Sequence, residues 1–134
     1  MIKEIIKQWD DNKHELENYF KTTKQSEYND YAIIVKKLLE LVIIDNWDVS
    51  KMTIIDDGEY QGTRIFIIPR STYQPSAEDY IVTDTYYGSC SGCDTLQGIS
   101  FYDDDLPTDI QVEEYMTLAL HLVQKLHYLS SNEE

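Results

Sequence analysis

The sequence predicts a single α+β domain, with an N-terminal helical hairpin, an antiparallel sheet of three or four strands, and a long C-terminal helix packed on the sheet. Two observations predict this class. Apolar residues recur at helical spacing near both ends of the chain, and short β-branched runs occupy its middle. The 134 residues suit one hydrophobic core, so we expect 1–134 to form one domain.

The helical hairpin is predicted from two apolar stripes. The first extends over 2–20, with charged residues between its apolar members. After a polar break, Ser26 or Asn29 is suited to cap a second helix whose apolar positions span 31–42. Residues 41–44 are apolar nearly all round, which indicates either a buried segment or an interface between copies of the chain.

The sheet is predicted from three runs. Residues 52–55 and 63–68 are short and β-branched, and they flank a turn-rich joint, so they indicate a β-hairpin. Pro69 ends its second strand, because proline lacks the amide donor that a central ladder needs. Residues 79–87 alternate large apolar side chains with smaller or polar ones, which indicates a strand with one buried face.

The chain closes with a helix. Thr108 and Gln111 form the pattern of a capping box, and apolar residues then recur at helical spacing from Tyr115 to Leu129. Between the sheet and this helix, residues 99–102 resemble a fourth short strand. They follow a small, polar stretch with no clear periodicity.

The chain is strongly acidic, and the acidity is uneven. Its 25 Asp and Glu against 11 Lys and Arg give a formal net charge of −14. Residues 1–51 hold 8 basic and 10 acidic side chains, whereas 52–134 hold 3 basic and 15 acidic ones. Nucleic acids and anionic lipids are bound through Lys and Arg, so we expect neither to be a direct partner.

No part of the chain looks like a membrane segment. The longest apolar run is far shorter than the roughly 20 residues that span a bilayer. The charged N-terminus does not resemble a signal peptide, so we expect a cytoplasmic protein. A lasting disulfide between Cys90 and Cys93 is not expected in that compartment.

Cys90 and Cys93 leave several alternatives open. A structural zinc site wants four ligands, and the remaining candidates are three histidines, of which His121 and His127 would point to different faces of one regular helix. A redox couple would need a thioredoxin-like βαβ unit that the pattern lacks. The pair is therefore kept as a thiol- or metal-dependent alternative, and we expect no catalytic residues and no cofactor.

The segment around these cysteines is interpreted in two further ways. It forms a tight turn permitted by Gly88 and Gly92, or it forms a recognition loop with exposed amides and short polar side chains. Under the second interpretation the contact surface joins this loop to the acidic second half. The candidate partner-binding residues are Asp84, Tyr87, Gly88, Ser91, Asp94, Asp103, Asp104, Asp105, Asp109, Glu113 and Glu114.

The run Tyr-Gly-Ser-Cys-Ser-Gly-Cys-Asp-Thr-Leu-Gln at 87–97, with the helix at 115–121, resembles small acidic proteins of phages and prophages of Gram-positive bacteria. That family brings no assigned activity, cofactor or catalytic residue. The resemblance implies a non-enzymatic protein that modulates a host machine, as an anti-defence or host-takeover inhibitor. Its acidic surface would occupy a nucleic-acid groove of a host protein by imitating phosphates.

Overall fold

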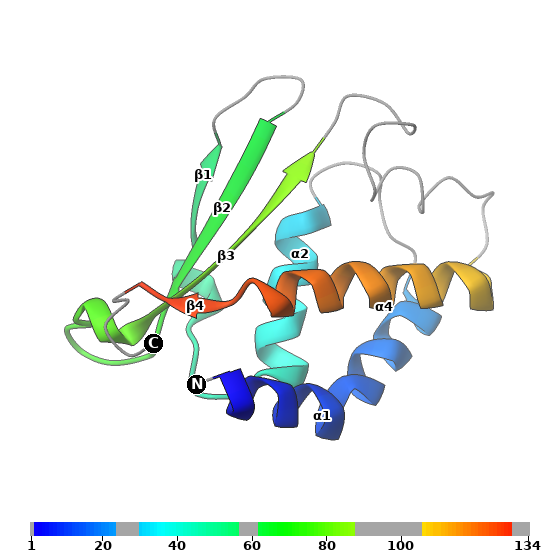
Figure 1. The fold of residues 1–134 in the computed structure, drawn as a ribbon, viewed down its shortest axis with the longest axis horizontal. Coiled ribbons are helices and arrows are strands. Elements are labelled where there is room, and N and C mark those ends of the chain that lie inside the picture. The colour runs from blue at the N-terminus through cyan, green and yellow to red at the C-terminus, as the bar shows by residue number, and fades with distance from the viewer. Residues whose placement is uncertain (1, 24–29, 57–61, 88–105, 130–134) are drawn as a thin grey trace.

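The computed structural model describes residues 2–23, 30–56, 62–87 and 106–129 and has an α+β fold, as the sequence predicts (Figure 1). Figure 1 shows α1 (Ile2–Thr22), α2 (Asp30–Lys37) and α4 (Asp109–Gln124) gathered beside the sheet. Their apolar faces and one face of the sheet enclose the core. The residues proposed to cap α2 lie outside the described ranges.

The second helix is less regular than its pattern predicts. After α2 the backbone widens into a π-helical segment, Leu38–Val42, where the amide of Ile43 donates to the carbonyl of Leu38 at 2.8 Å. The predicted regular helix over 31–42 is therefore corrected at its C-terminal end. Val42 and Ile43 are buried in the core, while Ile44 is 55% exposed. Two residues of the all-round apolar stretch, Val42 and Ile43, thus serve this chain's own core, whereas Ile44 does not.

Four antiparallel strands form the sheet in the order β1-β2-β3-β4. They are β1 (Thr53–Asp56), β2 (Gly62–Pro69), β3 (Tyr80–Tyr87) and β4 (His127–Tyr128). Phe66 pairs with Thr83 and Ile68 with Ile81, so these side chains share the buried face. The predicted hairpin and third strand are confirmed, and β1 lies at the edge away from β4.

The predicted extent of the closing helix is wrong. Both bonds of the capping box are present at Thr108, but α4 ends at Gln124 and the chain becomes extended at His127. The edge of β3 explains the change, because its free backbone groups accept a partner: Tyr128 pairs with Ile81, and the Leu129 amide donates to the Tyr80 carbonyl at 3.0 Å. The strand expected at 99–102 lies outside the described residues.

Aromatic packing and one buried hydroxyl fix α4 in place. The rings of Tyr115 and Phe20, both fully buried, stack with centroids 5.0 Å apart and join α4 to α1. The buried Thr83 hydroxyl donates to the Leu122 carbonyl at 2.8 Å and joins α4 to β3. No helix within the described ranges has the length and apolar character needed to cross a membrane.

Candidate functional site

A groove runs between α1 and α4 on the outside of the helical layer. It consists of two adjoining hollows, of about 500 and 420 Å³, that share Trp9 and Leu120 in their lining. Ile5 and Ile6 face Val123 at one end, and Glu17 faces Glu113 at the other. The two helices therefore run antiparallel along the groove, as their directions in Figure 1 allow.

Helical periodicity places the lining residues in rows. On α1 one row includes Trp9, Lys13 and Glu17, spaced four residues apart, and on α4 one row includes Met116 and Leu120 with the same spacing. Residues spaced in this way lie above one another on one helix face. A second row lies beside each of these, from Ile6 to His14 on α1 and from Glu113 to Thr117 on α4, so each wall of the groove is two rows wide.

The floor of the groove is apolar and is only partly covered. Trp9 is 8% exposed and packs into the core beneath, whereas Met116 and Leu120 are half-buried. Ile6 at the α1 wall is 53% exposed. The apolar side chains between α1 and α4 are therefore left partly exposed.

The rim of the groove carries negative charge that its neighbours do not neutralise. Asp10, Glu17 and Glu113 line the hollows against one lysine, Lys13, and one histidine, His14. These three carboxylates form no ion pair with the residues that the structure describes.

Asp11, on the adjacent face of α1, is paired in contrast, because the Nζ of Lys7 lies 2.6 Å from its carboxylate. The hydrogen bond and charge of Asp11 raise the pKa of Lys7 above its ordinary value. Asp10 and Glu17, on the groove side of α1, have no such lysine partner among the described residues.

The structure brings only part of the predicted contact surface together. Glu113 lines the groove, and Asp109 and Glu114 are exposed on the same helix. Asp84 lies elsewhere, because it is 3.5 Å from the Nζ of Lys125, beyond the opposite end of α4. Glu113 and Lys125 are 12 residues apart in the sequence, which corresponds to about 18 Å along the helix axis.

The remaining predicted residues cannot be placed. Tyr87 ends β3, but its side chain is outside what the structure describes. The others lie outside the described ranges: Gly88, Ser91, Asp94, Asp103, Asp104 and Asp105, with Cys90 and Cys93.

The histidines are arranged differently from the prediction. His121 is exposed on α4, whereas His127 lies in β4, so the premise that both share one helix is wrong. Within 2–23, 30–56, 62–87 and 106–129, no three His, Cys, Asp or Glu residues are placed to hold a metal ion.

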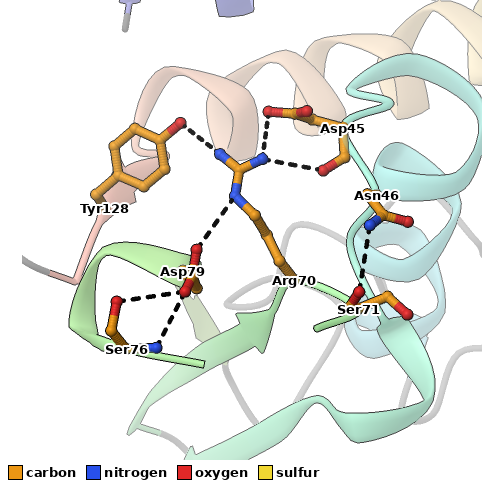
Figure 2. A network of polar contacts seen from close by, with 7 residues as sticks. All are labelled: Asp45, Asn46, Arg70, Ser71, Ser76, Asp79 and Tyr128. Atoms are coloured by element: carbon orange, nitrogen blue, oxygen red, sulfur yellow. Dashed lines mark hydrogen bonds and ion pairs between the residues drawn. The ribbon is translucent and has the colours of Figure 1, made fainter. Parts of the chain in front are cut away.

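A second polar cluster surrounds Arg70, just after β2 (Figure 2). Its guanidinium lies 2.7 Å from the Asp45 carboxylate and 3.2 Å from the Asp45 carbonyl. It also donates to the hydroxyl of Tyr128 at 2.9 Å and lies 3.9 Å from Asp79. Burial lowers the pKa of Arg70, but the bond and charge of Asp45, aided by Tyr128 and Asp79, outweigh burial and raise it.

The Arg70 cluster serves to hold distant segments together. The guanidinium stacks on the Trp47 ring at 4.4 Å, so its face as well as its edge is occupied. A hollow of about 310 Å³ adjoins the cluster, lined by Trp47, Tyr128 and the first turns of α1. The indole Nε1 of Trp47 is buried and has no hydrogen-bond partner among the described residues. Because these contacts within the protein occupy the guanidinium, it offers a ligand few hydrogen-bond donors.

Sequence reasoning placed the groove residues in the core and so missed the groove. The width of the apolar face of α4 was one available signal. Its apolar residues include Val112, Tyr115 and Ala119 and also the neighbouring Met116 and Leu120. An apolar arc that wide exceeds what one buried face requires. The charge of α1 gave no hint, because its Lys and acidic residues nearly balance.

The chain matches no protein-family model, no curated protein and no solved structure.

Proposed function

We propose that this protein acts by binding another protein in the groove between α1 and α4, and that it does so without catalysing a reaction. The observation that carries the proposal is the partly exposed apolar floor of the groove, framed by carboxylates that form no ion pair with any described residue. Apolar surface with a polar border is the usual composition of a protein contact, in which the apolar part supplies affinity.

The acidic rim adds selectivity to this contact. Carboxylates around an apolar patch attract a partner with a basic surface and repel acidic ones, and they speed the encounter. The resemblance to phage proteins of Gram-positive bacteria supports a host protein as the partner and inhibition of that protein as the outcome. A nucleic-acid-binding protein of the host would present the basic surface that the rim favours.

The proposal is tested by capture from a Gram-positive lysate with three forms of the protein. Ile6→Asp places a charge on the groove wall. Ile110→Asp is the matched control, because Ile110 is 69% exposed on α4 and does not line either hollow. We expect a partner that is retained by the wild type and by Ile110→Asp and is lost with Ile6→Asp.

Equal denaturation midpoints for the two variants establish that the comparison concerns binding and not folding. A captured set that is the same for both variants would contradict the proposal. So would a bound protein that is lost only with the Ile110→Asp variant.

A further inference from the structure

We infer that the occupant of the groove is an amphipathic helix of the partner that carries basic residues on its flank, an inference that rests on the proposed protein-binding function. The groove supplies three constraints on this occupant: its length, the hydrogen bonds that its backbone must form within itself, and the position of its charges. Each follows from the lining residues.

The length of the groove fits about three helical turns. From Ile6 to Glu17 the α1 wall rises about 17 Å, at about 1.5 Å per residue. A partner helix of roughly 11 to 12 residues covers the floor from one end to the other. Apolar anchors at i, i+3, i+4 and i+7 would reach Trp9, Leu120 and Met116 from above.

The walls of the groove favour a helix over an extended peptide. The backbone groups of α1 and α4 bond within their own helices, so an extended segment lying between them would find no backbone partners. A helix satisfies its own amides and carbonyls. It then needs only side-chain contacts, which the apolar floor offers.

The carboxylates specify where the positive charges lie. Asp10 and Glu17 are seven residues apart on α1, two helical turns, and Lys13 lies between them. A partner helix lying alongside presents Lys or Arg at positions i and i+7 on that flank, with a neutral or acidic residue midway opposite Lys13. Glu113 favours one further basic residue on the α4 side.

The same charges disfavour other occupants. Phosphate groups of a nucleic acid would meet like charge at the rim. A second copy of this chain would bring a surface of net charge −14 against another one. Neither would use the apolar floor together with the carboxylates of Asp10, Glu17 and Glu113.

The test selects binders from a display library of random peptides long enough for three helical turns. The enriched peptides are then measured against two matched triple variants. One neutralises the rim, with Asp10→Asn, Glu17→Gln and Glu113→Gln. The other neutralises three exposed carboxylates that do not line either hollow of this groove, with Glu4→Gln, Glu78→Gln and Glu114→Gln.

We expect enriched peptides with an apolar helical stripe and two basic residues seven positions apart, which gain helical circular dichroism on binding. Neutralising the rim should slow their association about tenfold at low salt and flatten its salt dependence, while the control triple leaves both nearly unchanged. This pattern supports the inference.

Two other results separate the failure of this inference from the failure of the proposed function. Peptides that do not bind the Ile6→Asp variant but are acidic, neutral or extended would overturn the inference of a basic helix. They would leave the proposal of a protein-binding groove intact. A dimer of this chain that Ile6→Asp dissociates, seen by light scattering, does the same. If no enriched peptide depends on Ile6, both the inference and the groove proposal fail.

Discussion

Arg70 shows how one residue organises segments far apart in the chain. Its guanidinium joins Asp45, after the π-helical segment, to Tyr128 in β4 and to Asp79, just before β3. Because its folded pKa lies above its unfolded one, the contribution of Arg70 to stability is complete below the unfolded pKa. It is lost only as the pH rises through the folded value, far above neutrality.

Replacing Arg70 with alanine should lower the free energy of unfolding by about 2 kcal/mol, since it leaves Asp45 and the Tyr128 hydroxyl without their shared donor. The free energy of unfolding of Arg70→Lys should lie between those of the wild type and Arg70→Ala, because an ammonium lacks the planar fork of a guanidinium. Urea denaturation measures both. Lys7→Ala is the control, and its exposed pair with Asp11 should matter little. Equal losses for Arg70→Ala and Lys7→Ala would contradict this account.

Trp47 carries a buried donor that no other described residue accepts, so its replacement has an unusual expected outcome. Trp47→Phe keeps an aromatic face under Arg70 and removes the unpaired indole N–H. The relief of that desolvation should offset most of the lost packing, leaving a change of less than about 1 kcal/mol. Large truncations of buried tryptophan cost about 3 to 5 kcal/mol. A loss in that range on thermal or urea unfolding would show that the indole N–H is satisfied.

At the scale of elements, α4 begins where its sequence predicts. The Gln111 amide donates to the Thr108 hydroxyl at 3.2 Å, and the Thr108 amide donates to the Gln111 side chain at 2.9 Å. Thr108→Ala should therefore lower the free energy of unfolding by about 1 kcal/mol. Thr117→Ala is the matched control on the same helix, because its exposed hydroxyl bonds only to the Glu113 carbonyl. A cap variant no less stable than this control would count against the role of the box.

The far end of α4 depends on β3. Thr83 is 1% exposed and donates to the Leu122 carbonyl, in the last turn of the helix. Thr83→Val keeps the shape and removes this donor, which should cost about 1 to 2 kcal/mol. Hydrogen exchange should report faster opening of the last turn of α4, while the first turn is unaffected. Uniform acceleration along α4 would argue that Thr83 acts on global stability alone.

These elements show what a linear pattern can and cannot predict. The helices, the hairpin and the cap of α4 follow from local spacing, and the structure confirms them. The end of α4 does not, because Leu126 and Leu129 continue its spacing. His127 and Tyr128 instead pair with residues of β3 that lie 45 and 47 positions earlier in the chain. A long-range hydrogen-bonding partner decides that boundary, and periodicity carries no information about it.

At the scale of the whole molecule, charge is organised more finely than a count reveals. The sequence places the acidity in the second half, whereas the groove draws two of its three rim carboxylates from α1. Pairing explains the difference, since Lys7 neutralises Asp11 and leaves Asp10 on the groove side. This difference is visible only when the ion-pair partner of each carboxylate is known. Of the predicted contact residues whose side chains the structure describes, Glu113 alone lines the groove.

If the groove between α1 and α4 receives a basic helix, that helix should perturb both walls of the groove. Amide chemical-shift mapping, with an enriched basic helical peptide added to the isotope-labelled protein, measures this. We expect shifts along 6–17 of α1 and 113–124 of α4, and none in β1. Shifts that centre on the β1 edge or around Asp84 and leave the two helices unchanged would contradict it.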